Sequence, residues 1–274
     1  MRRILVGLVR ACHPEPTAAV TVGAALLAVV VGRSPAGVAA VAVAVLASQL
    51  AVGWCNDALD AGRDALTGRA DKPIPAGLVS RRTVAVGAVV AALATVPLSF
   101  LSGPRAAAAL LLALVSGLLY DWPLKFTMLS VVPYLVSFGA LVAFVPLGLP
   151  GAPAPPAWLV VAGALLGAGA HFANVLPDLD DDARTGVRGL PHRLGRTGSW
   201  VAATVLLASA TGALAFGPPG PPSWAALLIV AGTVVALGVA GYAARTAGSR
   251  AAFRAVLLVA VADVTLLLLA GSRV

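Results

Sequence analysis

Nine apolar stretches divide this sequence and restrict its fold more than any other feature. They cover residues 17–32, 36–55, 83–101, 105–120, 128–149, 157–177, 199–216, 223–243 and 252–270. Stretches of this length suit the hydrocarbon core of a bilayer, which is about 30 Å thick. Because 59% of the residues are hydrophobic and only 11% are charged, a water-soluble fold is excluded. The sequence predicts an all-α, polytopic membrane protein of nine transmembrane helices, with residues 1–274 forming one domain.

Positive charge gathers on one side of these predicted helices. If the N-terminus is on side one, only Arg33, Arg105 and Arg273 fall on the other side, and the remaining 16 of the 19 Lys and Arg residues share side one. Basic loops stay in the cytoplasm. We therefore expect a multi-pass protein of a bacterial inner (plasma) membrane, with a cytoplasmic N-terminus and an external C-terminus. The net charge of +8 then reflects topology, and no nucleic acid partner is expected.

The acids and the longest loops share this cytoplasmic side. Ten of the eleven Asp and Glu residues lie there, all but Asp263, together with loops at about 56–82 and 178–198. Any chemistry should therefore take place in a central cavity that opens to the cytoplasm. The short apolar run at residues 4–9 is cut by Arg10 and His13, so the first residues are expected to form a cytoplasmic lead-in and not a signal peptide.

An acidic stretch follows the second apolar run. On a helix, Asn56, Asp57, Asp60 and Asp64 would share one broad face, because residues three, four and seven apart lie on the same side. Aspartates at the end of a membrane helix are costly unless they face a polar cavity or a cation. Such a face can hold divalent cations.

The same pattern occurs again 118 residues later in the chain. Six identities keep this constant offset: Asn56, Asp60, Asp64, Ala65, Thr67 and Gly68 match Asn174, Asp178, Asp182, Ala183, Thr185 and Gly186. We interpret this as a pseudo-repeat, with two carboxylate-bearing helices near 36–64 and 157–182 that face each other. The alternatives are an acidic loop that is merely solvated, or a calcium site, for which no Asp-x-Asp-x-Asp-Gly loop is found.

Oxygen ligands without a Cys or His cluster favour Mg²⁺, or Mn²⁺ as an alternative, over Zn²⁺. Magnesium usually binds through one or two carboxylates together with substrate phosphates. Metal and guanidinium charge would stabilise a diphosphate leaving group as its C–O bond breaks. Six basic residues lie within or shortly after the acidic stretches and would surround that diphosphate: Arg63, Arg69, Lys72, Arg184, Arg188 and Arg193.

These acidic stretches resemble the two aspartate motifs of the UbiA superfamily of intramembrane prenyltransferases. Asn56-Asp57-x-x-Asp60-x-x-x-Asp64 is similar to the first motif, and Asp178-x-x-x-Asp182 is similar to the second. Three flanking segments look similar as well, at residues 71–77, 120–125 and 189–195. With helices at matching places, the resemblance spans nearly the whole chain.

The resemblance implies Mg²⁺-dependent transfer of a prenyl group from an allylic prenyl diphosphate to a hydrophobic acceptor in the membrane. Two ions are implied, the first held by Asn56, Asp57, Asp60 and Asp64, and the second by Asp178 and Asp182. The catalytic group would be Asp60, Asp64, Asp178, Asp182 and Tyr120, with Tyr120 near the reacting end of the prenyl chain. The expected substrate contacts are Asn56, Arg63, Lys72, Lys125, Asn174, Arg188 and Arg193.

Several residues keep more than one interpretation. Asp181 lies one helical turn from Asp178 and is a further candidate for the metal, while Lys125 lies five residues after Tyr120, a spacing found in only some members of the superfamily. His171 would support Asn174 or orient an acceptor. Asp263 would pair with a polar group on a neighbouring helix or contact substrate.

Three rival functions stay open on the sequence. A UbiA-type terpene cyclase would use the diphosphate without a separate acceptor, and a phosphoribosyltransferase would act on a lipid phosphate. A transporter or lipid-binding scaffold would also place polar residues between two halves, but transporters favour the bilayer midplane. The acceptor itself is open among aromatic compounds, quinone precursors, lipid alcohols and carotenoid end groups.

Overall fold

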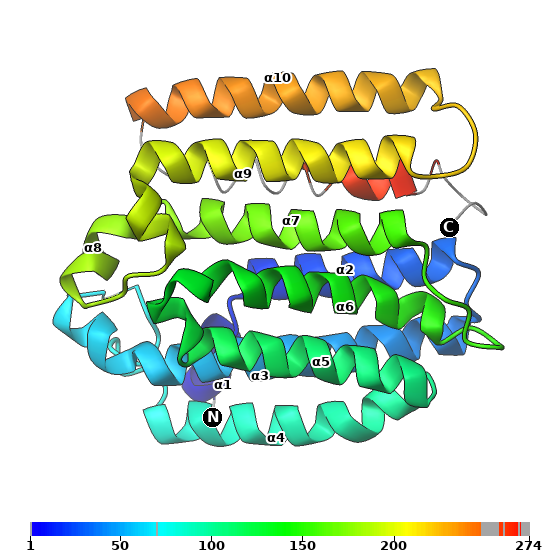
Figure 1. Cartoon of the computed structure of the whole chain (residues 1–274). Coiled ribbons are helices and arrows are strands. Elements are labelled where there is room, and N and C mark those ends of the chain that lie inside the picture. The colour runs from blue at the N-terminus through cyan, green and yellow to red at the C-terminus, as the bar shows by residue number, and fades with distance from the viewer. Residues whose placement is uncertain (1, 70, 248–257, 260, 268, 270–274) are drawn as a thin grey trace.

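The computed structural model describes residues 2–69, 71–247, 258–259, 261–267 and 269 (Figure 1). This described part is helical and contains no β-strand. The long helices are α2 (Pro14–Val30), α3 (Pro35–Leu66), α4 (Arg81–Phe100), α5 (Pro104–Asp121), α6 (Val132–Leu147), α7 (Ala157–Val175), α9 (Leu190–Phe216) and α10 (Trp224–Ala247). Shorter ones are α1 (Arg2–Ala11), α8 (Leu179–Arg184) and two 3₁₀ helices, η1 (Leu124–Phe126) and η2 (Met128–Val131). The predicted all-α membrane fold is confirmed.

Within the described ranges, seven helices are long and apolar enough to cross a membrane, or eight if α1 and α2 form one bent span. The nine spans of the prediction are therefore not all found. The last of them, at residues 252–270, falls largely outside the described residues, and only 258–259, 261–267 and 269 of it can be discussed.

The first residues, which the sequence predicts to be a cytoplasmic lead-in, form helix α1. The axis of α1 makes an angle of 67° with α2, and His13 at the break has a left-handed φ of 54°. Pro14 begins α2, because proline is well tolerated in the first turn of a helix. The Trp54 indole of α3 donates to the Leu8 carbonyl at 2.8 Å and joins α1 to the bundle.

The second acidic motif does not continue a long helix, which corrects the predicted helix near 157–182. Helix α7 ends at Val175, and the separate short helix α8 begins at Leu179. Pro177 lies at this break, where it has no N–H for a helical hydrogen bond. The predicted loop to residue 198 is also shorter, since α9 already begins at Leu190 and bends at Gly195, whose φ is 68°.

The long helices lie side by side and run alternately in opposite directions (Figure 1). Helix α3 packs against α2, α4 and α5, while α7 packs against α6 and α9. The end of α3, helix α8 and the two 3₁₀ helices gather at one end of the bundle (Figure 1). Both acidic motifs are thereby placed at the same end.

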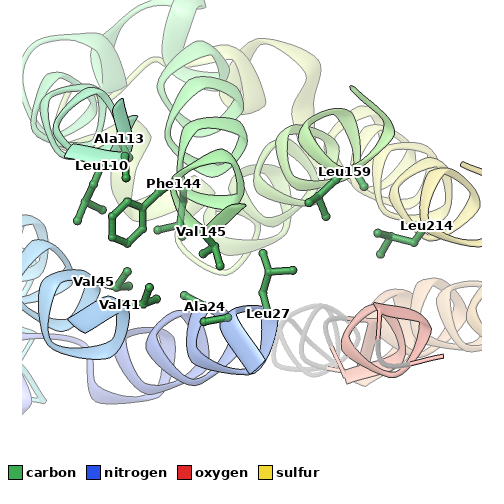
Figure 2. Packing of buried hydrophobic residues seen from close by; sticks show 14 of the residues in the cluster. Ala24, Leu27, Val41, Val45, Leu110, Ala113, Phe144, Val145, Leu159 and Leu214 are labelled. Carbon is green, nitrogen blue, oxygen red and sulfur yellow. The ribbon is translucent and has the colours of Figure 1, made fainter. Parts of the chain in front are cut away.

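The main hydrophobic core lies toward the opposite end of the bundle. It includes Val41 and Val45 of α3, Phe144 of α6, Leu159 at the start of α7 and Leu214 near the end of α9 (Figure 2). Phe144, Val41 and Val45 are fully buried. This packing joins the helices below the acidic end and leaves that end to polar side chains.

Close contact of α3 with the α1–α2 break gives a stability prediction. A methyl group at Gly53 would lie 2.7 Å from the Cys12 carbonyl oxygen, which belongs to the backbone and cannot rotate away. We expect Gly53→Ala to lower the free energy of unfolding by about 1–3 kcal/mol. Gly212→Ala in α9 is the matched control, because among the described residues no atom outside the local helix backbone lies within 4 Å of its added methyl. The melting temperatures of both variants in detergent test this prediction. A Gly53→Ala variant that melts at the same temperature as Gly212→Ala, or at a higher one, would contradict this packing.

Candidate functional site

A large cavity connects the acidic end of the bundle with the hydrophobic core. Its volume is about 970 Å³. Asp60, Asp64, Asp178 and Asp182 line it at one end, and Leu27, Leu141, Leu159 and Leu214 line it toward the core. A cavity of this size suits a small-molecule ligand. Its polar mouth and apolar depth fit a molecule with a charged head and a hydrocarbon tail.

Three residues of the first motif face the cavity from α3. Asn56, Asp60 and Asp64 follow each other at intervals of four and line the cavity as one row. Asp57 is at the edge of this row. Its side chain is 1% exposed, it is not among the cavity-lining residues, and it accepts a hydrogen bond from Lys72 Nζ at 3.2 Å. The structure thus brings three of the four expected ligands of the first motif into the cavity.

Two lysines from different segments contact the first motif. Lys125, in η1, lines the cavity, is 5% exposed and donates to Asp60 Oδ1 in a short contact. Lys72 belongs to the segment between α3 and α4 and also lines the cavity. The spacing of Lys125 from Tyr120 therefore does not keep it out of the site.

Arginines connect the two motifs across the cavity mouth. Arg69 Nη1 lies 3.2 Å from Asp178 Oδ1, and Arg63 lies 2.7 Å from Asp60 and 3.7 Å from Asp182. Partial burial raises the pKa of Asp178, and the positive charge of Arg69 offsets part of this rise. The two motifs, 118 residues apart in the chain, thus share Arg63, while Arg69 connects the second motif to the segment that follows the first.

The second motif divides between the cavity and solvent. Asp178 and Asp182 line the cavity, and so does Asp181, whose carboxylate contacts Arg184 at 3.2 Å. Asp180 is 81% exposed and pairs with Arg196 at 3.3 Å outside the cavity. His192 lies 3.4 Å from Asp182. Asn174, one turn before the break in α7, also faces the cavity.

Two expected substrate contacts are placed elsewhere. Arg188 and Arg193 are exposed, and neither is among the residues that line the cavity. His192, which directly precedes Arg193 in the chain, lines the cavity beside the second motif instead. Arg193 lies in the first turn of α9, where consecutive side chains point in different directions. Its closeness in sequence to the second motif therefore did not show whether its side chain faces the cavity.

An aromatic cluster lies below the acidic row and was only partly predicted. Tyr120 of α5 has its ring centroid 4.8 Å from that of Tyr134 of α6, and both surround His171 of α7 at 5.4 and 4.8 Å. His171 Nε2 contacts the Ser130 hydroxyl at 3.1 Å. The sequence analysis gave Tyr134 no role, because an aromatic residue in an apolar run does not differ in pattern from core packing.

Asp121 is a second residue that the sequence analysis missed. It is 1% exposed and accepts a hydrogen bond from Asn56 Nδ2 at 3.0 Å. Because the Asn56 nitrogen is held by Asp121, the Asn56 carbonyl oxygen is the amide atom left to face a cation. The position of Asp121 directly after Tyr120 was visible in the sequence, but its partner 65 residues away was not.

The donor set fits Mg²⁺ in combination with a phosphate ligand. Among the described residues, no three Asp, Glu, His or Cys side chains form a metal site by themselves. However, Asp64 Oδ2 is buried without a hydrogen-bond partner in this part of the chain, and it lies in the cavity-facing row. Magnesium commonly takes one or two carboxylates and completes its shell with phosphates and water. A row of separated carboxylates and an amide oxygen suits that ion.

Comparison with known proteins decides the family. Residues 17–267 match the UbiA prenyltransferase family. The chain belongs to this family. It is therefore a prenyltransferase, embedded in a membrane, as the two aspartate motifs implied.

Related proteins agree with this assignment. The chain is 34% identical over 194 residues to digeranylgeranylglyceryl phosphate synthase of Methanopyrus kandleri, a match covering 66% of this chain and 69% of that protein. The fold is similar to a UbiA homologue from Aeropyrum pernix K1, with a TM-score of 0.76 and 21% identity over 93% of this chain and 98% of that one. A UbiA homologue from Archaeoglobus fulgidus bound to DMAPP and Mg²⁺ gives a TM-score of 0.70 and 14% identity over 97% and 99%.

The Lys72–Asp57 ion pair is expected to stabilise the fold around this UbiA-family site. Lys72→Met would leave the buried Asp57 carboxylate without its cation, and we expect the free energy of unfolding in EDTA to fall by about 3 kcal/mol. Adding Asp57→Asn should recover much of the loss, because no buried charge is then left unpaired. Chemical unfolding of the single and double variants measures both effects. A double variant no more stable than Lys72→Met would rule out this coupling.

Proposed function

We propose that this protein transfers a prenyl group from an allylic prenyl diphosphate to a hydrophobic acceptor within the membrane, in a Mg²⁺-dependent reaction. The observation that carries the proposal is that Arg63 contacts both Asp60 and Asp182, so that the two acidic motifs meet at the mouth of one cavity with an apolar interior. The homologue bound to DMAPP and Mg²⁺ has the same fold and supports this choice of ligands.

The diphosphate head would bind at the cavity mouth. We assign metal binding to the cavity-facing acids and amide of both motifs, namely Asn56, Asp60, Asp64, Asp178 and Asp182. Bound Mg²⁺, in two ions or with Mn²⁺ in its place, supplies positive charge that stabilises the departing diphosphate. Lys125, Arg63 and Arg69 already pair with these acids, and Lys72 pairs with the neighbouring Asp57. All four cations could turn to the oxygens of a bound diphosphate, which carries more negative charge than a single carboxylate.

The prenyl chain would extend from the mouth toward the core. Its reacting carbon then lies near the Tyr120 and Tyr134 rings, whose faces attract positive charge as the C–O bond breaks. The cavity depth also keeps bulk water away from this carbon, which favours attack by the acceptor over hydrolysis. His171 contacts both rings and would help to hold them in place.

For the acceptor, we propose a lipid alcohol as the first class to test. The support is the name of the Methanopyrus relative, a digeranylgeranylglyceryl phosphate synthase, which points to a glyceryl acceptor in that protein. Phenolic and quinone-precursor acceptors form the comparison set. We also propose that the site opens to the cytoplasm, because the acidic end carries most of the basic residues.

The aspartates of the two motifs give the main functional prediction. With Mg²⁺, geranylgeranyl diphosphate and a lipid alcohol acceptor, the purified protein should release diphosphate, and Asp60→Ala or Asp178→Ala should reduce the rate by about 100-fold or more. EDTA should abolish release, because the carboxylates alone carry no positive charge to stabilise the leaving group. Release is measured by a coupled diphosphate assay.

Asp180→Ala is the matched control within the second motif. Its carboxylate is 81% exposed and outside the cavity, so the rate should stay within about twofold of the wild type. If Asp60→Ala and Asp180→Ala retained the same activity, the assignment of the motif would be wrong. Assays with the diphosphate alone separate transferase from cyclase, since a cyclic hydrocarbon formed without acceptor would favour the cyclase.

A further inference from the structure

One carboxyl group lies deep in the cavity, far from both acidic motifs. Asp263, in the described part of the last predicted helix, is 2% exposed and lines the same cavity as the aspartate motifs. The hydroxyl of Thr211 in α9 donates to Asp263 Oδ1 at 2.8 Å. The proposed transfer chemistry does not use this pair, because it lies toward the apolar end.

The position of the pair follows from helix geometry. Thr211 is 16 residues after Gly195, where α9 bends close to the acidic end, so it lies about 24 Å farther along the helix. Leu214 and Leu267, both beyond Asp263 in the direction of the core, also line the cavity. Asp263 therefore interrupts the apolar wall about one helical turn before Leu267.

The carboxyl of Asp263 is only partly satisfied. The single hydrogen of the Thr211 hydroxyl has a second acceptor, the Leu207 carbonyl at 3.2 Å. Asp263 Oδ2 is buried and has no hydrogen-bond partner within the described ranges. A buried oxygen of this kind requires water or another polar group, and leaving it unpaired is unfavourable.

We propose that Asp263 and Thr211 form a specificity-determining subsite that limits the length of the prenyl tail. A tail that ends before Asp263 leaves space for water to hydrogen-bond Oδ2. A longer tail displaces that water, places hydrocarbon against the carboxyl and leaves the oxygen unpaired. The subsite thus favours geranylgeranyl-sized donors over longer polyprenyl diphosphates. This inference rests on the proposed function, since it takes the cavity to hold the prenyl tail.

Calorimetric binding of geranylgeranyl and hexaprenyl diphosphate, with Mg²⁺ and without acceptor, tests the subsite. We expect Asp263→Ala to shift the ratio of the two Kd values by about tenfold toward the longer donor, because the unpaired oxygen is removed. Asp263→Asn keeps a polar group of the same size and should leave the ratio near that of the wild type. Thr211→Val removes the partner of the carboxyl and should shift the ratio toward the shorter donor.

Leu214→Ala separates polarity from space, because it enlarges the same end of the cavity and keeps the carboxyl. It should shift the ratio less than Asp263→Ala does. Equal shifts for Leu214→Ala and Asp263→Ala, or an unchanged ratio in both Asp263→Ala and Thr211→Val, would overturn the proposal. If neither donor bound to the wild type, the proposed function itself would fail. If both donors bound but the ratio of their Kd values did not change in the variants, only the subsite proposal would fail.

Discussion

The structure depends on the pairing of carboxylates with cations at the boundary of the membrane. An isolated charge is expensive in hydrocarbon, and a buried ion pair is tolerated only when its geometry satisfies both partners. Here Asp57, Asp60 and Asp178 each contact a Lys or Arg that comes from another segment or from the next helical turn. These pairs bring the segment after α3, the η1 turn and the second motif into one polar site.

The rest of the fold positions this site. The apolar core at the opposite end (Figure 2) fixes the helices, so that α3 and α7 present their polar ends at the same end of the bundle (Figure 1). The cavity between them is apolar along most of its depth, and its mouth alone carries the two motifs. The lysines and arginines that neutralise the acids without a ligand are the same groups that a diphosphate would recruit. A site of this kind is preorganised for an anion bound together with divalent cations.

Much of this arrangement could be predicted from the sequence, because it depends on local pattern. The apolar stretches located the long helices, and the four-residue spacing of Asn56, Asp60 and Asp64 placed them on one face. One prediction failed on a local signal, because Pro177 separates α7 from α8. The other predictions that were wrong or incomplete depend on tertiary contacts. Helix α1, for example, is joined to α3 through Trp54. The inward turn of His192 in place of Arg193, and the pairing of Asp121 with Asn56, likewise require knowledge of which helices are neighbours.

The central claim is that both motifs hold metal ions on the same diphosphate. Electron paramagnetic resonance of the protein loaded with Mn²⁺ and inorganic diphosphate tests this directly, because two ions bridged by one ligand give a spin-coupled signal. We predict a coupled pair in the wild type, and an uncoupled single ion in both Asp60→Ala and Asp178→Ala. A coupled pair that persists in either variant, or an uncoupled signal in the wild type, would contradict the account.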